Sequence, residues 1–465
     1  MKNKKELTKV VYWSRIGFIT LQYICNQLLP DHQADAFRYP APKDKTTFDD
    51  FIDHTLGGFL RWDAQYFMHI ARYGYTYEQT LAFFPLYPIT VGYMGQFISS
   101  IVGDAYLDSI LLILFITFNV YVFKLAADYL YELTNLLFNE TIAFHSVLIY
   151  CFNPATIFFL APYTETIFSC LSFYSMYQVV KLYKNYDTLI KTNWFYPKMI
   201  LSAFTIGLTG LTRSNGLLNT GFYLYCSLCL LKSYNPPRKI RFCLFVFVTT
   251  ILCVLPFVLF QLFSYKRFCE HTSFEFPSQV LEYGKSNSFV LPLAYQERNI
   301  TWCLSYAQLP YSYVQDYYWN VGFFKYYTLK QLPNFLIALP ILVVVTYSCF
   351  EHFYCNLVRR KLFNIFLMEN PKESRSSKCD IYQPQLTLFY GHALFLAVFC
   401  IFFVHIQVST RLLCSASPIF YWICGIKINI SKRRECTADG HFMVVYCILY
   451  VCIGIIMFSN FLPWT

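Results

Sequence analysis

Residues 242–263 read FCLFVFVTTILCVLPFVLFQLF, and this run decides the class of fold. It contains no charged residue and is long enough to cross the roughly 30 Å hydrocarbon core of a bilayer as a helix of about 20 residues. Other clear runs cover 10–28, 110–130, 335–350, 386–404 and 442–462. Weaker ones cover 82–102, 143–160, 166–180, 200–211, 217–231 and 412–426. The pattern predicts an all-α polytopic membrane protein with about ten to twelve transmembrane helices.

Composition supports the same class. The chain is 56% hydrophobic, 20% aromatic and 14% charged, and its mean hydropathy is +0.39. Soluble domains carry about 25% charged residues, so much of this surface must face lipid. No internal repeat and no low-complexity tract divides the chain. We therefore expect one membrane-embedded domain over residues 1–465.

Basic residues predict the sidedness of the helices. The net charge of +10 does not indicate a nucleic-acid partner, because Lys and Arg gather before the first run and in short segments at 232–241, 359–378 and 427–434. Basic loops face the cytosol in membrane proteins. We therefore expect a cytosolic N-terminus on a retained first helix and a cytosolic loop at 351–384.

The opposite, lumenal face is then expected to hold the segments that are poorer in Lys. These are a first lumenal loop at 29–81, a large lumenal loop at 264–331, a segment near 153–165 and a turn at 405–411. Strict alternation of all twelve runs does not reproduce these sides. One segment between residues 82 and 160 must therefore be half-spanning, re-entrant or miscounted.

If the loop 264–331 is lumenal, two chemical modifications are expected in it. Asn299-Ile300-Thr301 is a glycosylation sequon, which suits a lumenal position and predicts a glycan on Asn299. Cys269 and Cys303 lie in the same loop and could bridge in an oxidising compartment. Most of the 18 cysteines lie within apolar runs and are expected to behave as small hydrophobes.

Arg61-Trp62-Asp63-Ala64 places an acidic residue in a loop between two apolar runs. Apolar side chains recur at helical spacing over residues 55–71, which predicts an interfacial amphipathic helix with aromatic anchors at headgroup level. Such a helix would hold Asp63 against a cavity between lipid and lumen. The alternative is that Asp63 only pairs with Arg61 or caps a turn.

Polar residues also interrupt other membrane ends. Asn153-Pro154 and Pro162 to Glu165 break an apolar stretch, and irregular backbone at membrane depth is tolerated only where it is buried or lines a cavity. Arg213-Ser214-Asn215-Gly216 lies between two runs, and Gln407 with Arg411 flanks another. Such residues are costly in membranes and often functional. The alternative for each is a snorkelling arginine or a helix-end turn.

Together these motifs resemble the PIG-V family, the second mannosyltransferase of glycosylphosphatidylinositol (GPI) assembly, in glycosyltransferase family 76 with a GT-C fold. The resemblance rests on an ordered set that runs from about residue 56 to residue 422. Its members are Arg61-Trp62-Asp63-Ala64, Gly74-Tyr75-x-Tyr77-Glu78, Ala82-Phe83-Phe84-Pro85, Asn153-Pro154-Ala155, Tyr163-Thr164-Glu165, Arg213-Ser214-Asn215-Gly216, YYWNVGFF at 317–324, Pro333-Asn334-Phe335 and Thr410-Arg411.

The resemblance implies an inverting enzyme of the endoplasmic reticulum membrane. It would transfer the second mannose, in α-1,6 linkage, from dolichyl-phosphate mannose to the GPI precursor, with Asp63 as general base. Arg213 and Arg411 would stabilise the leaving phosphate. The full set expected to bind substrate is Arg61, Trp62, Glu78, Asn153, Glu165, Arg213, Asn215, Gln407 and Arg411. No cofactor is expected and no DxD motif for a metal-held diphosphate is present, so metal dependence stays open. A small accessory membrane subunit is allowed as a partner.

Two other functions fit parts of the sequence. One is another GT-C transferase that uses a dolichol-phosphate sugar to build the N-glycan precursor. The other is a multi-pass transporter or lipid carrier. A transporter should carry its ionisable groups mid-membrane on broken helices related by a repeat, whereas Asp63 lies in a loop.

Overall fold

The computed structural model describes residues 2–42, 45–231, 234–270, 275–295, 300–304, 309–359, 384–433 and 438–464. Within these residues every regular element is a helix and none is a strand. The longer helices are α1 (Lys2–Leu28), α4 (Leu86–Val102), α5 (Leu107–Leu137), α7 (Glu165–Lys184), α9 (Phe195–Gly210), α11 (Pro236–Cys269), α14 (Leu332–Arg359), α15 (Thr387–Phe402), α17 (Ile419–Arg433) and α18 (Ala438–Ser459), with the 12-residue α10 (Thr220–Leu231) between α9 and α11. The all-α expectation is confirmed.

Four helical stretches in the described residues are long and apolar enough to cross a membrane. They cover Asp104–Leu137, Pro236–Cys269, Leu329–Asn356 and Gly440–Ser459. Much of α11 faces outward, with Leu244, Phe247 and Leu259 all more than half exposed. Apolar side chains gain nothing from exposure to water. The exposed face of α11 therefore suits lipid, and the polytopic expectation is confirmed.

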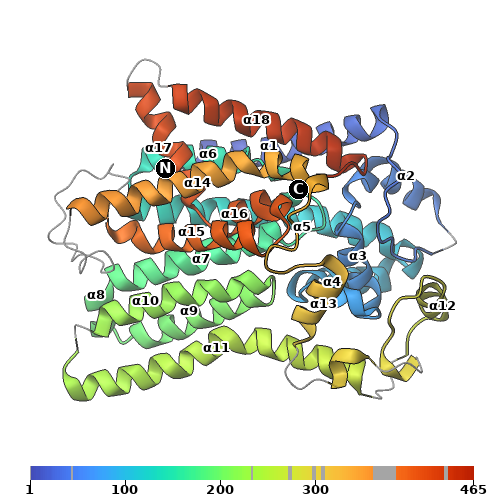
Figure 1. Cartoon of the computed structure of the whole chain (residues 1–465), viewed down its shortest axis with the longest axis horizontal. Helices are drawn as coiled ribbons and strands as arrows, with labels where there is room; N and C mark the ends of the chain where they lie inside the picture. Colours follow the sequence, from blue (N-terminus) through green and yellow to red (C-terminus); the bar gives the residue numbers. More distant parts are fainter. Residues whose placement is uncertain are drawn as a thin grey trace.

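Four short helices gather at one end of the bundle, at the right in Figure 1. They are α2 (Thr47–Leu56), α3 (Ala64–Tyr73), α12 (Ser278–Ser286) and α13 (Pro310–Trp319). The first two come from the segment 29–81 and the other two from 264–331. The backbone N–H of Glu78 donates to the carbonyl of Val290, which joins these segments directly. The two loops expected on the lumenal face therefore share one end of the molecule.

Helix α6 (Glu140–Cys151) is a short apolar helix within the region 82–160, where the sequence left the topology open. Its 12 residues extend about 18 Å at 1.5 Å per residue, which is too short to cross a bilayer. The helix ends before Asn153-Pro154, and the Asn153 side chain bonds to the carbonyl of Tyr150 and the N–H of Ala155. Arg15 of α1 donates to the carbonyl of Cys151. These bonds satisfy backbone groups that the break would otherwise orphan.

The predicted span 412–426 is wrong as a single helix. The structure divides it into α16 (Ser409–Ala416) and α17 (Ile419–Arg433), separated at Ser417-Pro418. Proline lacks an N–H donor, and it disfavours helical backbone at the residue before it. Ser417 accordingly has extended backbone, with φ −129° and ψ 135°.

The single amphipathic helix expected over 55–71 is also wrong. Helix α2 ends at Leu56, and a short 3₁₀ turn at Gly57–Phe59 leads to the loop before α3. Two adjacent glycines weaken a helix because each costs about 1 kcal/mol relative to alanine. Trp62 has a φ of 53°, which a continuing right-handed helix cannot contain. Asp63 therefore stands at the start of α3 rather than within a helix.

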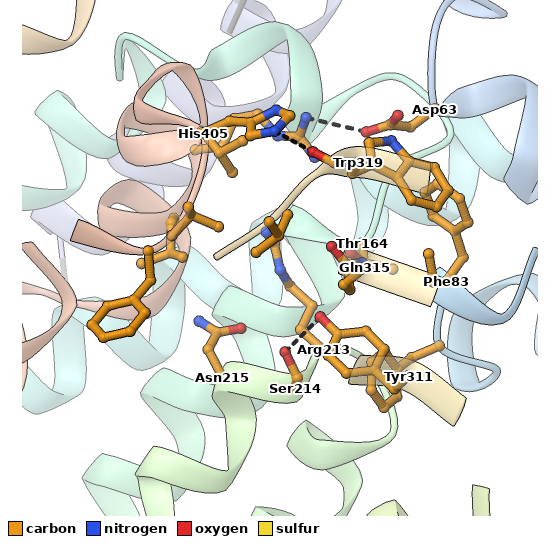
Figure 2. Close-up of a pocket in the computed structure, with 18 of the residues that line it drawn as sticks. Asp63, Phe83, Thr164, Arg213, Ser214, Asn215, Tyr311, Gln315, Trp319 and His405 are labelled. Atoms are coloured by element: carbon orange, nitrogen blue, oxygen red, sulfur yellow. Dashed lines mark hydrogen bonds and ion pairs between the residues drawn. The ribbon is translucent and has the colours of Figure 1, made fainter. Parts of the chain in front are cut away.

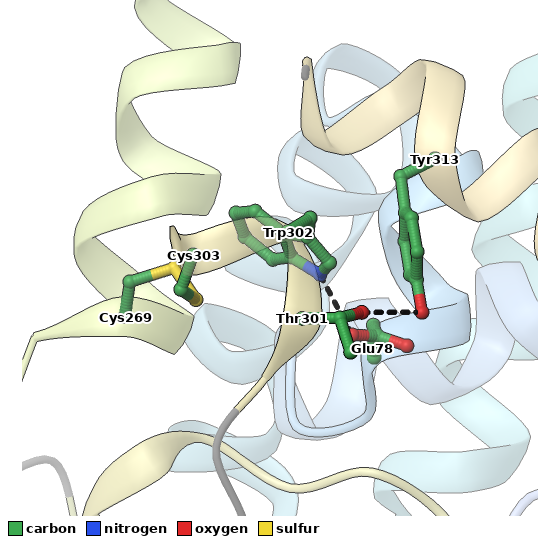
Figure 3. Close-up of a disulfide and its surroundings, with 6 residues drawn as sticks. All are labelled: Glu78, Cys269, Thr301, Trp302, Cys303 and Tyr313. Carbon is green, nitrogen blue, oxygen red and sulfur yellow. Dashed lines mark hydrogen bonds between the residues drawn. A yellow bond between two sulfur atoms is a disulfide. The ribbon is translucent and has the colours of Figure 1, made fainter. Parts of the chain in front are cut away.

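The disulfide left open by the sequence is present, joining Cys269 at the end of α11 to Cys303 (Figure 3). Next to it, Glu78 accepts hydrogen bonds from Trp302 Nε1 and Tyr318 Oη, both at 2.7 Å. The loop expected at 264–331 begins later, because α11 continues to Cys269. Asn299 lies outside the described residues. In the expected loop 351–384, residues 351–359 belong to α14 and 360–383 lie outside the described residues.

Gly92 tests the contact that seats α3 on α4. A Cβ added at this buried glycine would lie 2.5 Å from the carbonyl oxygen of Ala71, a backbone atom that cannot move without shifting α3. We expect Gly92→Ala to destabilise the fold by about 1–3 kcal/mol through overpacking, seen as a lower thermal unfolding temperature in detergent. Gly17→Ala on α1 is the control, because no atom lies within 4 Å of its added Cβ. Equal unfolding temperatures for the two variants would contradict this packing.

Candidate active site

A cavity of about 410 Å³ opens at the end of the bundle where the short helices gather. Its walls come from the start of α3, the turn before α4, the segment between α9 and α10, helix α13, and the connection from α15 to α16 (Figure 2). One part of the lining is polar: Asp63, Thr164, Thr212, Arg213, Ser214, Asn215, Ser312, Gln315 and Arg411. The rest is largely aromatic or apolar: Phe67, Phe83, Phe84, Tyr311, Trp319, Phe399, Phe403, Val404 and Val408.

Asp63 lies at the wall of this cavity with its side chain 30% exposed. Its backbone N–H donates to the hydroxyl of Tyr163 at 3.0 Å, and its carbonyl accepts from the N–H groups of Tyr66 and Phe67. Its carboxylate oxygen Oδ2 lies 3.2 Å from Nη1 of Arg411. The carboxylate is therefore oriented by fixed backbone and by one guanidinium, and still reaches the cavity.

Glu165 is the centre of the charge network. Its Oε1 accepts from Nη1 of Arg213 at 2.7 Å and from Nε of Arg411 at 2.8 Å. The Glu165 side chain is fully buried, while each arginine is 15% exposed and lines the cavity. One buried carboxylate thus holds two cavity arginines in place.

The protonation of Glu165 follows from these neighbours. Burial by itself raises the pKa of the carboxyl, but the positive charges of Arg411 and Arg213 outweigh burial and hold the pKa below its usual value. The pKa of Arg411 is raised, because the two carboxylates outweigh its own burial. Both shifts favour the ionised forms, so Glu165 and Arg411 stabilise each other as a buried ion pair.

Aromatic rings surround the cationic side of the network. The Arg411 guanidinium lies 4.6 Å from the ring centroid of Phe158 and 4.9 Å from that of Tyr163. Such contacts favour a cation and restrict its movement. At the far side of the cavity, Ser214 Oγ lies 2.9 Å from the Tyr311 hydroxyl, beside Asn215 (Figure 2). The cavity thus offers a carboxylate at one side and hydrogen-bond donors at the other.

The structure brings five of the expected site residues together: Asp63, Glu165, Arg213, Asn215 and Arg411. The other expected residues have protein partners away from the cavity lining. Arg61 pairs with Asp31 at 2.8 Å, and Trp62 packs on Phe461. Asn153 caps the helix break, and Gln407 accepts from the Tyr326 hydroxyl at 2.9 Å.

Glu78 is another expected site residue that does not line the cavity. It is buried beneath α13, and burial raises the pKa of its carboxyl while the bonds from Tyr318 and Trp302 partly offset that rise. Helix α13 supplies Tyr311, Gln315 and Trp319 to the cavity. Glu78 therefore supports the cavity wall from behind.

Sequence reasoning did not select several cavity residues, chiefly Ser214, Tyr311, Gln315, Trp319 and His405. His405 Nε2 is hydrogen-bonded to the carbonyl of Trp319, which ties α13 to the α15–α16 connection. Ser214 belongs to the quoted Arg213-Ser214-Asn215-Gly216 motif and Trp319 to YYWNVGFF, so a signal for both was present. His405 had none beyond its place in a short polar turn. The described residues hold no group of three or more His, Cys, Asp or Glu side chains that could bind a metal.

An all-helical bundle with membrane-length apolar helices and a cavity of carboxylates and arginines at one end is typical of a membrane-embedded enzyme. The family model for the mannosyltransferase PIG-V matches residues 4–465. The chain therefore belongs to the PIG-V mannosyltransferase family and is a glycosyltransferase, which confirms the resemblance.

Full-length relatives agree with this assignment. The chain is 34% identical to GPI mannosyltransferase 2 of Drosophila melanogaster, covering 99% of this chain and 100% of the relative. It is 29% identical to human GPI alpha-1,6-mannosyltransferase 2, over 100% and 99% of the two chains. Among solved structures, an Archaeoglobus fulgidus oligosaccharyltransferase tethered to an acceptor peptide matches with a TM-score of 0.46 and 11% identity, covering 98% of this chain and 56% of that one.

Arg411→Lys tests the shared arginine. Arg411 reaches Glu165 through Nε and Asp63 through Nη1, and a lysine has one nitrogen that cannot replace both contacts. Since charge-assisted bonds are each worth about 1.5–3 kcal/mol, we expect transfer activity to fall at least about tenfold at normal abundance. Arg72→Lys is the matched control, because Arg72 is equally buried but pairs with Asp108 alone, outside the cavity. Near-normal turnover of Arg411→Lys would favour a snorkelling arginine.

Proposed function

We propose that this chain adds the second mannose of the GPI precursor in α-1,6 linkage, with dolichyl-phosphate mannose as donor and Asp63 as general base. Membership of the PIG-V family supports a GPI mannosyltransferase, and the cavity supports the assignment of Asp63. In this proposal donor and acceptor, both lipid-linked, meet in the cavity at the membrane surface of the endoplasmic reticulum, on its lumenal side. A small accessory membrane subunit, if one is required, would co-purify with the active protein.

One observation carries the assignment of the base. Of the two acidic residues in the network, Asp63 is 30% exposed and lines the cavity, whereas Glu165 is fully buried and engaged by two arginines. A general base must come within hydrogen-bond reach of the proton that it removes. Asp63 meets that requirement for an acceptor hydroxyl in the cavity, and Glu165 does not.

The reaction needs one base and one stabilised leaving group. The acceptor hydroxyl oxygen attacks C1 of the donor mannose from the face opposite the phosphate, and its proton passes to Asp63. The new C1–O bond forms as the C1–O bond to phosphate breaks, and the electron pair leaves with the phosphate oxygen. Attack from the opposite face inverts a β-linked donor to an α product.

The leaving phosphate would lie against the arginine side of the cavity. Each guanidinium has five N–H donors, and the network uses two nitrogens of Arg411 and one of Arg213. Donors that remain can stabilise negative charge as it grows on the phosphate. Ser214 and Asn215 line the same region and can add neutral hydrogen bonds. Because Glu165 balances much of the positive charge, the site favours a transient anion without trapping the product permanently.

Asp63→Asn tests the base. The amide keeps an oxygen that can accept from Arg411 but loses the ability to take a proton. A positioned base contributes about 10²–10⁴-fold, so we expect kcat for mannose transfer to fall at least about a hundredfold, with little change in the KM of either substrate. Asp187→Asn, an exposed residue at the start of α8 (Tyr186–Lys191), is the control. The variant would be assayed in purified form at matched abundance. More than about a tenth of the activity remaining would remove Asp63 from this role.

The lumenal side can be tested independently. Asn299 is the sequon residue of the loop expected in the lumen, so a glycosidase should increase the protein's mobility on a gel and Asn299→Gln should abolish that shift. Cleavage at this loop by protease added to sealed, right-side-out microsomes would contradict the orientation. A mutated sequon elsewhere, Asn429→Gln in the basic cytosolic cluster, should leave mobility unchanged.

A further inference from the structure

Trp62, the residue before the proposed base, has an unusual backbone conformation. Its φ of 53° lies in the left-handed region, which is uncommon for residues other than glycine and is an outlier for a bulky side chain. Such a residue stays in this region only where the surrounding structure holds it there. The backbone of Trp62 sets the direction in which the chain enters α3, and therefore the direction of the Asp63 side chain. Whatever holds Trp62 also orients the base.

The hydroxyl of Tyr163 contacts the backbone on both sides of Trp62. It accepts from the N–H of Asp63 at 3.0 Å and donates to the carbonyl of Arg61 at 3.4 Å. The Arg61 carbonyl also accepts from the N–H of Ala64 at 3.1 Å, which closes the turn. One side-chain oxygen therefore joins the two peptide units that flank the left-handed residue.

Tyr163 is well placed to hold this turn, because it is itself immobile. Its side chain is 1% exposed. Its ring packs edge-on against Phe158 and Phe458, with centroids 5.0 and 5.8 Å away, and the Arg411 guanidinium lies 4.9 Å from its centroid. Tyr163 is not among the described residues that line the cavity. Its hydroxyl is therefore a fixed point behind Asp63.

The turn that carries Asp63 thus has two separate links to the same part of the protein. Tyr163 holds its backbone, and Arg411, which also bonds to Glu165, holds its carboxylate. Tyr163 precedes Glu165 by two positions in the irregular chain between α6 and α7. A catalytic group must be held within about 0.5 Å of its productive position. Two links constrain the position of the carboxylate better than one.

We propose that Tyr163 is a positioning residue, whose hydroxyl holds Trp62 in the left-handed conformation and so directs the carboxylate of Asp63 at the acceptor hydroxyl. This inference rests on the proposed function, in which Asp63 is the base. Tyr163 touches neither substrate and takes no proton. Its loss should therefore lower kcat, which depends on the alignment of the base, and leave substrate binding intact.

Tyr163→Phe removes the hydroxyl and keeps the ring beside Arg411. We expect kcat for mannose transfer to fall about tenfold, with KM for each substrate changed less than about twofold. Tyr87→Phe is the matched control, because Tyr87 is equally buried and its hydroxyl donates to the carbonyl of Phe115 at 3.2 Å, away from the cavity lining. Its kcat should stay near that of the wild type. Both are assayed as purified full-length protein with dolichyl-phosphate mannose and the GPI precursor that carries one mannose.

Two substitutions at Trp62 separate positioning from general stability. Trp62→Ala and Trp62→Gly remove the same indole, but only glycine adopts the left-handed region without steric cost. In the Trp62→Ala background, adding Tyr163→Phe should again lower kcat about tenfold; in the Trp62→Gly background it should lower kcat less than about threefold, because the turn no longer needs to be held. Thermal unfolding in detergent gives the folded fraction by which each kcat is corrected.

Each outcome either supports or overturns this role. Equal losses in the alanine and glycine backgrounds, or a loss that disappears after correction for folded protein, would show that the hydroxyl of Tyr163 only stabilises the fold. Unchanged kcat in Tyr163→Phe, with Asp63→Asn inactive, would overturn the positioning role and leave the base in place. Activity retained by Asp63→Asn would overturn the base, and the positioning role with it. A loss in kcat alone that glycine at position 62 relieves supports the inference.

Discussion

The shared carboxylate oxygen of Glu165 is the interaction on which the site depends. It accepts from Arg213 and Arg411, and Arg411 continues to Asp63. Removing one partner of a buried ion pair costs about 3–5 kcal/mol, because the remaining charge is left without compensation. The loops that carry these four residues are therefore constrained together. The position of Asp63, the proposed base, therefore depends on this buried charge network as well as on the backbone of its own loop.

Breaks in helices make this network possible. An uninterrupted helix through residues 152–164 would carry Glu165 along the bundle axis, but the chain between α6 and α7 is irregular and returns to the cavity. Its backbone groups find partners inside the protein, since Asn119 donates to the carbonyl of Ala161 at 2.6 Å and Thr166 donates to that of Phe159 at 2.8 Å. Irregular backbone is stable at membrane depth only when it is satisfied in this way. The irregular segment between α6 and α7 is therefore also what places Glu165 beside the cavity.

The active-site cavity combines two chemical environments. Charge and hydrogen bonding are concentrated at one end of the bundle, under the cover of α13. Apolar and aromatic side chains line the rest of the cavity, and the α15 end contributes Phe399 and Phe403 to it. The disulfide between Cys269 and Cys303 and the buried Glu78 hold the cover against α11 and the first loop. A reaction between two membrane-bound molecules needs a polar and an apolar environment close to the reacting carbon.

Three features could be predicted from the sequence alone: the class of the fold, the helix break at Asn153-Pro154, and the candidate base in Arg61-Trp62-Asp63-Ala64. These features are local, because apolar length, proline geometry and a motif can each be read within a few residues. The sequence did not reveal that 55–71 divides at Gly57 or that 412–426 divides at Pro418, since apolar periodicity outweighed those residues in the prediction. Which polar residues share a cavity depends on how distant segments pack, and it could not be predicted. Glu165 meets Arg213 across 48 positions and Arg411 across 246, and Asp63 meets Arg411 across 348. No local pattern predicts such pairings, and none predicts the hydrogen bond between His405 and the carbonyl of Trp319, 86 positions away.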